Sequence, residues 1–359
     1  MSKVAVLLTS PERVFEDYKR LLHLAEFETF LPKDTATFLK INISWHHWYP
    51  ACSTTPWQLE GVIKTLLAAG YPKENIIGAH NKTVVVSDRV GEVYNKHKLV
   101  TDKYGIPMVY LNEELVKWER YEPKGKMLVL DKVFPKGILI PKLFSGKSII
   151  HLPTMKTHVF TTITGAMKNA FGGLLSENRH WTHSVIHETL VDLLTIQKEI
   201  HPGVFAVMDA TFAGEGPGPR CMIPHVKNYI LASADQVAID AISAKMQGFD
   251  PLSLKFIRLA HEKGLGCGDP NQIEIVGEDI SKVNFRFKWG DTLASKGQKA
   301  IYHGWLKPFE HLLLRTPIVP WSFFASKLYH DLYWYPFVGK KRVKEMQKTD
   351  WGQLFLNYR

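Results

Sequence analysis

The sequence predicts an α/β fold, with two α/β layers of mixed or mostly parallel sheets and a basic, aromatic-rich C-terminal segment. Short apolar runs alternate with stretches whose apolar residues recur at helical spacing. The 359 residues exceed one typical domain, so we expect one at residues 1–145 and another at 146–280. Residues 281–359 hold 14 basic and 5 acidic residues, nearly the whole net charge of +10, and form a separate tail.

Strands and helices alternate in the first predicted domain. The hydroxyl of Thr55 can cap a helix that begins at Pro56 and ends near Gly70. Strands are predicted at residues 4–8, 37–43, 76–79, 84–86 and 107–111, and the other helices at 11–24 and 90–104.

The second predicted domain repeats this alternation. Strands are predicted at 149–152, 204–208, 229–232 and 273–276, and helices at 181–200, 237–246 and 257–263. In open α/β sheets, ligands bind beyond the carboxyl ends of the strands. Asn42, Lys156, Asp209 and Asp235 each follow a predicted strand, so we expect one interdomain cleft that gathers them.

The stretch from residue 149 to residue 173 holds many of the candidate ligand groups. It combines lysines with threonines and glycines, which supply donors to oxyanions and allow close approach of the backbone. The alternative is a set of solvated lysines beside a Gly-Gly turn. The residues predicted to bind a phosphate, a carboxylate or an anionic cofactor are Lys40, Asn42, Lys156, Thr157, Lys168, Asn169 and Asp235. Asp235 has a second interpretation, as the cap of the helix that follows it.

Four residues are predicted to be catalytic: His158, His183, Glu215 and Asp209. Histidine is the usual proton shuttle near neutral pH, and a carboxylate in a glycine-rich loop can act as a general base. His183 and His187 also have the spacing of a divalent-metal pair on one helix face. The alternatives are a partly buried helix face for the histidines and a solvated turn for Glu215.

The remaining motifs restrict the class of cofactor. Cys52, Cys221 and Cys267 have no metal-ligand spacing, so no iron–sulfur cluster is expected from this chain, whereas a divalent metal stays a candidate. The loop at residues 45–50, Trp-His-His-Trp-Tyr-Pro, concentrates aromatic and imidazole side chains. The start does not have the pattern of a signal peptide, and a cytoplasmic location is expected.

Several motifs taken together resemble one family. They are Lys156-Thr157-His158, residues 164–169 (Thr-Gly-Ala-Met-Lys-Asn), Phe171-Gly172, residues 40–42, residues 54–56, residues 214–217 after Asp209, and residues 233–240. This set resembles the domain of unknown function 362 family over roughly residues 35–278. The resemblance implies little chemistry, because the activity of the family is largely undefined. Many relatives carry ferredoxin-like cysteine modules, and this chain does not.

The tail has two interpretations. Prolines divide residues 306–338 into helical pieces too short to span a bilayer, and aromatic rings prefer the headgroup boundary. Lys340, Lys341, Arg342 and Lys344 follow at once, which favours a segment lying on an anionic membrane surface. Alternatively, the aromatic rings cover the core of the body. The rings concerned are Trp321, Phe323, Phe324, Tyr329, Tyr333, Trp334, Tyr335 and Phe337.

Two classes of function follow from these patterns. The first is an enzyme that binds an anionic small molecule or cofactor and does acid–base or redox chemistry on it, at a membrane surface if the tail is interfacial. The second is a non-catalytic ligand-binding or scaffold protein of a membrane-associated system. Nucleic-acid binding is not expected, because the body lacks a basic stripe and a recognisable module.

Overall fold

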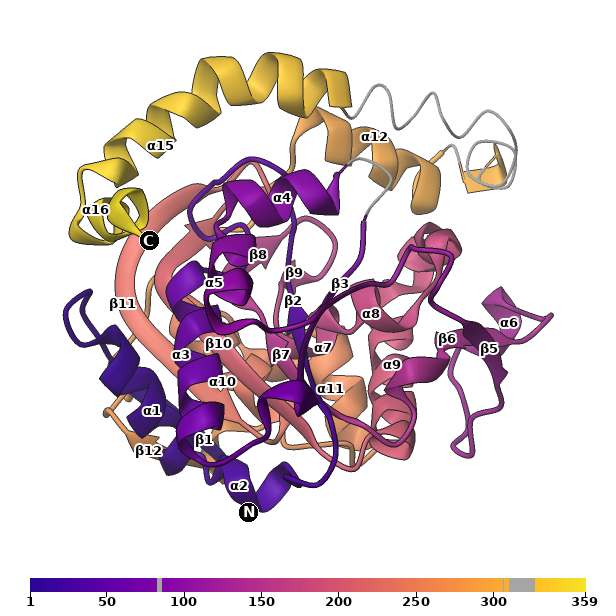
Figure 1. The fold of residues 1–359 in the computed structure, drawn as a ribbon. Coiled ribbons are helices and arrows are strands. Elements are labelled where there is room, and N and C mark those ends of the chain that lie inside the picture. Colours follow the sequence, from indigo (N-terminus) through magenta and orange to yellow (C-terminus); the bar gives the residue numbers. More distant parts are fainter. Residues whose placement is uncertain (83–85, 306, 310–326) are drawn as a thin grey trace.

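One mixed sheet runs through the middle of the protein (Figure 1). The computed structural model describes residues 1–82, 86–305, 307–309 and 327–359. The strand order is β12-β1-β11-β10-β7-β2-β3-β4, and most neighbouring strands are parallel, which confirms the predicted α/β class. The strands of this path are β1 (Ser2–Leu8), β2 (Thr37–Ile41), β3 (Ile76–His80), β4 (Met108–Tyr110), β7 (Ser148–Leu152), β10 (Val204–Glu215), β11 (Ile223–Ser233) and β12 (Ile273–Gly277).

Strands from both predicted domains belong to this one sheet. β2 pairs in parallel with β7, and every residue of both strands is buried, as expected for central parallel strands. The boundary predicted near residue 145 therefore falls between elements that share one sheet. Short strands β8 (Thr154–His158) and β9 (Thr162–Ile163) extend it, and β5 (Trp118–Tyr121) pairs with β6 (Ile138–Pro141) apart from it.

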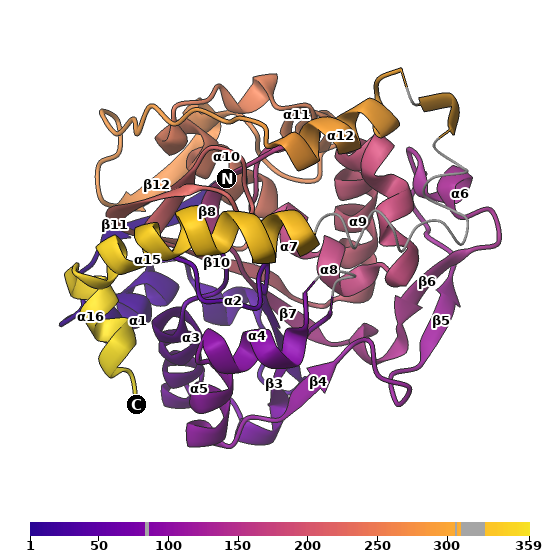
Figure 2. The ribbon, with the colours of Figure 1, turned by 90° about the horizontal axis from the view of Figure 1, so that it is seen from above.

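Helices cover both faces of the sheet (Figure 2). α1 (Val14–Leu24), α3 (Pro56–Ala68) and α5 (His97–Tyr104) pack over one face, with the C-terminal helices beside them. The other face carries α7 (Ala166–Asn169), α8 (Phe171–Leu174), α9 (Ile186–Ile200), α10 (Gln236–Gln247) and α11 (Lys255–Glu262). Other helices are α2 (Phe27–Phe30), α4 (Asp88–Tyr94), α6 (Leu130–Val133) and α12 (Leu293–Tyr302).

Some helix ends agree with the predictions from neighbouring residues, and others differ from them. Thr55 and Gln58 form the capping box of α3, with Pro56 at its first position, as predicted. The helix predicted at 90–104 is instead two helices, because Lys96 adopts a left-handed conformation (φ 61°) between α4 and α5. The strand predicted at 84–86 lies mostly outside the described residues.

The described part of the tail packs against the body. A π-helical segment, η7 (Leu328–Gly339), leads into α15 (Lys340–Gln347) and α16 (Asp350–Asn357). Trp48 stacks on Phe355 with ring centroids 3.9 Å apart, and Trp57 contacts Trp351 at 5.1 Å. None of the described helices is both long enough and apolar enough to cross a membrane. The predicted interfacial rings Trp321, Phe323 and Phe324 lie outside the described residues.

Candidate anion-binding site

Six basic side chains gather near the carboxyl ends of β2 and β7. We call Lys40, Lys156, Lys168, Arg179, His158 and His183 the basic cluster; they come from β2, β8, α7 and the 3₁₀ segment η3 (Glu177–Val185). Charges within the cluster act on one another: those of Lys156, Lys168 and Arg179 lower the pKa values of neighbouring members. Lys40, Lys156 and His158 are at most 5% exposed, so the structure brings together five of the residues predicted from sequence and buries three of them.

Glycines and carbonyl oxygens determine where the two deepest lysines lie. A Cβ atom at Gly173 would stand 3.1 Å from Lys40 Cε, so the missing side chain makes room for the lysine stem. Asn169 Nδ2 donates to the Lys40 carbonyl at 2.8 Å and joins α7 to β2. Lys156 Nζ donates to Thr154 Oγ1 and to the Cys52 carbonyl, both at 2.7 Å.

A buried carboxylate holds the turn that carries Lys168. Asp240 accepts from the backbone N–H of Ala166 at 2.6 Å and of Met167 at 3.1 Å, at the start of α7. A Cβ at Gly165 would lie 2.0 Å from Asp240 Oδ1, so only glycine fits here. Burial raises the pKa of Asp240 to about 7, although the two backbone N–H groups oppose the rise.

The cations of the cluster are not balanced by acids. Among the described residues, no ion pair joins Lys40, Lys156, Lys168 or Arg179 to a carboxylate. Burial lowers the pKa of Lys40 to about 7, and it lowers those of Lys156 and Lys168 to about 8, with neighbouring cations adding to the effect on Lys40 and Lys168. Buried charges are normally paired, so this arrangement is suited to an anion that supplies the missing charge.

The two histidines of the cluster differ in the hydrogen-bonding group on Nε2: one offers a donor and the other an acceptor. His158 Nδ1 accepts from the backbone N–H of Phe160 at 3.1 Å, which places the proton of the neutral ring on Nε2. His183 Nδ1 lies 3.1 Å from the His180 carbonyl and must donate to it, which leaves its Nε2 with a lone pair. Burial, together with the charge of Lys168, lowers the pKa of both rings, that of His183 to about 3, so both are neutral at pH 7.

Two predicted ligand residues are used by the scaffold around the cluster. Asn42 Nδ2 donates to the Cys52 carbonyl at 3.1 Å and holds the loop that also binds Lys156. Thr157 Oγ1 donates to the Gly216 carbonyl at 2.7 Å and joins β8 to the end of β10. Both side chains therefore support the site through contacts with backbone.

Asp209 does not follow a strand, because β10 continues to Glu215. Its carboxylate is completely buried and accepts from Tyr18 Oη at 2.7 Å, Trp57 Nε1 at 2.9 Å and Thr55 Oγ1 at 2.9 Å. Thr211 donates to it from both its backbone N–H and its hydroxyl. Five donors make Asp209 a junction of the core, and this geometry gives its predicted catalytic role no support.

Asp235 follows β11, which lies three strands away from β2 in the sheet order. β11 runs antiparallel to β10, with Ser233 level with Ala206 near the amino end of β10. Asp235 caps α10 by accepting from the N–H groups of Val237 and Ala238 at 2.9 Å. The cap is the second interpretation of Asp235 offered by the sequence, and its role in the ligand site stays a prediction.

Glu215 contacts His225 and Lys288, and His187 lies on a different helix from His183. Glu215 Oε2 lies 2.8 Å from His225 Nε2, and its Oε1 accepts from the Lys288 N–H. His183 belongs to η3 and His187 to α9, and Val185 between them (φ −128°, ψ 36°) breaks the helix. The metal pair predicted at His183 and His187 needed one continuous helix face and loses its basis.

Arg179 also belongs to the cluster, although the sequence motifs did not predict it. Its guanidinium donates to the Lys82 carbonyl, while its Nη1 is buried without a hydrogen-bond partner in the described structure. Burial lowers its pKa to about 10. No local pattern distinguishes Arg179 from a solvated arginine, because its neighbours in the cluster come from other elements.

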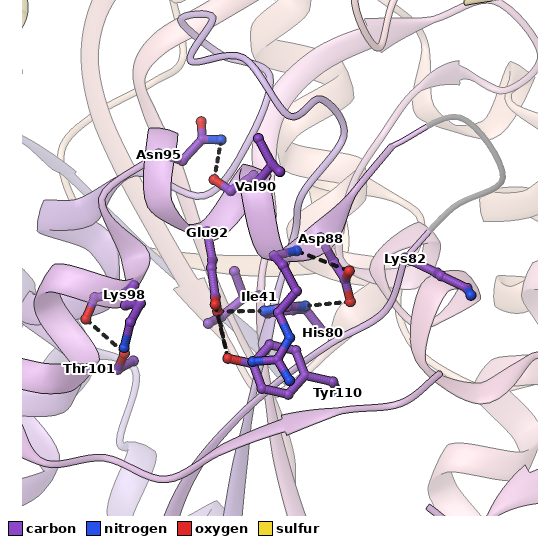
Figure 3. Close-up of polar contacts among 12 residues, drawn as sticks. Ile41, His80, Lys82, Asp88, Val90, Glu92, Asn95, Lys98, Thr101 and Tyr110 are labelled. Atoms are coloured by element: carbon purple, nitrogen blue, oxygen red, sulfur yellow. Dashed lines mark hydrogen bonds and ion pairs between the residues drawn. The ribbon is translucent and has the colours of Figure 1, made fainter. Parts of the chain in front are cut away.

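A second ionisable group lies on the adjacent strand (Figure 3). We call His80, Asp88, Glu92 and Tyr110 the His80 group. His80, at the end of β3, points between Glu92, 3.1 Å from its Nε2, and Asp88, 3.5 Å from its Nδ1. Tyr110 donates to Glu92 at 2.9 Å. Burial would raise the pKa of both carboxyls, but His80 and the other donors hold them below their ordinary values.

Comparison with known proteins settles the family. A family model described as a domain of unknown function (DUF362) matches residues 37–245, which include β2, β8, α7 and η3. The chain belongs to this family. The basic cluster therefore lies wholly within the family region, whereas α15 and α16 lie outside it.

A relative was also found among curated proteins. The thylakoid-associated protein sll1697 of Synechocystis sp. (strain ATCC 27184 / PCC 6803 / Kazusa) is 28% identical over 124 residues. The alignment covers 33% of this chain and 37% of that protein, so the two share about a third of their lengths.

Proposed function

We propose that the family region binds an anionic small molecule or cofactor at the basic cluster and performs acid–base chemistry on it. The observation that carries the proposal is a set of buried and half-buried cations, Lys40 and Lys156 with Lys168 and Arg179, that have no carboxylate partner among the described residues. An anion bound among Lys40, Lys156, Lys168 and Arg179 would offset the cost of burying their charges. The phosphate or carboxylate groups of a ligand match these donors.

The enzymatic part of the proposal rests on proton chemistry. A lysine with a pKa near 7 or 8 exchanges its proton readily at neutral pH. His158 Nε2–H is a donor and His183 Nε2 is an acceptor, as deduced from their backbone contacts. The nearby thiol of Cys52 is a poor nucleophile, because burial raises its pKa to about 11 and it donates to the Pro219 carbonyl.

Binding is tested by melting curves in phosphate, pyrophosphate or citrate. We expect each effective anion to raise the melting temperature of the wild-type protein and to have little effect on the Lys156→Met/Lys168→Met double variant. Lys98→Met is the matched control, because Lys98 is exposed and pairs with Asp102 on α5. Equal stabilisation of the wild type and the double variant by every anion would contradict the proposed site.

Catalysis requires a separate experiment. Native mass spectrometry of the purified protein identifies a copurifying ligand, which is then incubated with enzyme in D₂O. Incorporation of deuterium at carbon by the wild type, reduced at least tenfold in His183→Gln, supports proton transfer. Tight binding without exchange or turnover would favour the alternative, a ligand-binding or scaffold protein.

A second proposed property is association with an anionic membrane surface. On η7, Leu332, Tyr333 and Phe337 are 68%, 58% and 73% exposed, while Trp334 is buried against the body. Lys340, Lys341 and Lys344 follow on the surface of α15. Exposed apolar rings beside lysines are typical of interfacial segments. The printed name of the Synechocystis relative also refers to a membrane, the thylakoid.

Sedimentation with liposomes containing anionic lipid tests this property. We expect the wild type to pellet at low salt and the Leu332→Ser/Phe337→Ser variant to stay in the supernatant. Leu115→Ser is the control, since Leu115 is 91% exposed on a distant loop. No pelleting of the wild type, or equal pelleting of all three proteins, would remove the membrane from the proposal.

A further inference from the structure

We infer that His46, His47 and Asp331 form a binding site for a divalent transition metal of the zinc class. Each residue offers one ligand atom, and these atoms all lie within 4.8 Å of one another. The histidines belong to the aromatic loop between β2 and α3, and Asp331 belongs to η7 of the C-terminal segment. The site thus joins residues far apart in the sequence and lies outside the basic cluster.

The spacing of the ligand atoms is close to that of a metal site. His46 Nε2 lies 3.7 Å from Asp331 Oδ2, which is too long for a hydrogen bond. Bonds of about 2.0–2.2 Å to Zn²⁺ place neighbouring ligand atoms about 3 Å apart. Closing the group around an ion therefore needs only small side-chain movements, and a water molecule can complete four-coordination.

Contacts behind the ligands hold them in place. Trp45 Nε1 donates to Asp331 Oδ1 at 2.8 Å, which leaves Oδ2 turned toward His46. The ring of His47 stacks on Tyr335, with centroids 4.1 Å apart and planes 4° from parallel. Such outer contacts orient the ligands of a metal before it binds.

The ligand set favours a metal that prefers nitrogen. Two of its three members are imidazoles, and only Asp331 is a carboxylate. Ca²⁺ and Mg²⁺ depend on oxygen ligands, which this set supplies from one residue only. Zn²⁺ gains more from imidazole nitrogen.

The position indicates a structural role for the metal. The loop that carries His46 and His47 also carries Cys52, whose carbonyl holds Lys156. A metal bound to this loop and to Asp331 would tie the C-terminal segment to the support of the basic cluster. The site does not depend on the proposed function of that cluster.

The test measures metal binding by the full chain carrying no polyhistidine tag. After equilibration with Zn²⁺ and gel filtration, we expect about one zinc per chain, and Co²⁺ should give visible absorption bands of low-symmetry coordination. Asp331→Asn keeps the shape of the side chain and an acceptor for Trp45, and it should weaken zinc binding at least tenfold. Zinc should also raise the melting temperature of the wild type but not that of Asp331→Asn.

Two further variants make the result decisive. His46→Gln removes one ligand that has no close hydrogen bond to lose, and should also weaken binding at least tenfold. His23→Gln, on the exposed surface of α1, should bind zinc like the wild type. Melting curves in EDTA show whether each variant is folded. Failure of the wild type to bind zinc at micromolar concentration, or unchanged binding by Asp331→Asn and His46→Gln, would overturn the inference.

Discussion

The basic cluster and the His80 group lie near the same edge of the sheet, yet their charges are arranged in opposite ways. In the His80 group, one imidazole meets two carboxylates, and a tyrosine satisfies Glu92 as well. In the basic cluster, buried and half-buried lysines and an arginine lie together with neutral histidines, and the described contacts of the cations are to neutral oxygens. The first group pairs its imidazole with carboxylates of the fold, whereas the second has no carboxylate partner among the described residues.

This difference indicates which group stabilises the fold and which group is suited to a function. A group whose charges are matched inside the fold stabilises the native state and offers little to a ligand. A group whose charges are unmatched costs stability unless something binds to it, and such costs concentrate at functional sites. Burial and shifted pKa values are common to both groups, so the two groups are distinguished by the charge of the neighbouring side chains.

The largest expected effect comes from removing a carboxylate of the His80 group. Glu92→Ala leaves His80 and Tyr110 buried without their partner and should lower the free energy of unfolding by about 3–5 kcal/mol. Urea denaturation measures it, and Glu92→Gln, which retains an acceptor for Tyr110, should cost less. A loss below about 1 kcal/mol for Glu92→Ala would show that the His80 group is not a stabilising unit.

A smaller effect should follow from disturbing the basic cluster without changing its charges. Gly165→Ala places a methyl group against Asp240 and should cost about 1–3 kcal/mol of stability. It should also weaken anion binding, because the start of α7 carries Lys168. Gly290→Ala is a control, since no atom lies near its Cβ position. Normal stability and binding in Gly165→Ala would mean that the turn adapts freely.

The pH dependence of stability should differ between the two groups. The folded pKa values of Lys40, Lys156 and Lys168 are about 7 to 8, below the value near 10.4 of the unfolded chain. Between pH 7 and pH 9.5 the unfolded chain therefore binds more protons, and the free energy of unfolding should rise. Denaturation in anion-poor buffer at each pH measures this rise.

The carboxyls of the His80 group should respond in acid. The pKa values of Asp88 and Glu92 are lowered in the folded state, so their contribution is present above pH 4 to 5 and is lost as pH falls through the folded values. In the Lys156→Met/Lys168→Met variant, the free energy of unfolding should rise less above pH 7, and its loss in acid should be the same as in the wild type. An identical rise in this variant would assign the alkaline effect to other groups.

The smallest expected effect is that of removing one cation from the basic cluster. Lys156→Met eliminates a buried charge and two hydrogen bonds, so the free energy of unfolding without anion should change by less than about 1 kcal/mol. Chemical denaturation with and without phosphate measures both states. A loss comparable to that of Glu92→Ala would mean that Lys156 is structural and that the two groups do not differ as argued.

Part of the candidate site was accessible from local patterns. The lysines at 156 and 168 stood out because threonines and glycines surround them in the sequence, and the structure joins them to Lys40 through Asn169. The caps of α3 and α10 also followed from neighbouring residues, since a cap is formed within a few positions of the helix end. Arg179 carried no such signal, because the contacts that bury it come from elsewhere in the chain.

The sequence by itself determined the α/β class, most strands and helices, and the donor-rich turn, because periodicity, caps and glycines act over a few residues. Only the tertiary structure decided which strand ends coincide. The strand order places β11, which leads to Asp235, three strands from β2, and the length of β10 places Asp209 inside the core. Strand direction and burial depend on pairing between segments distant in the chain, so no local pattern contains them.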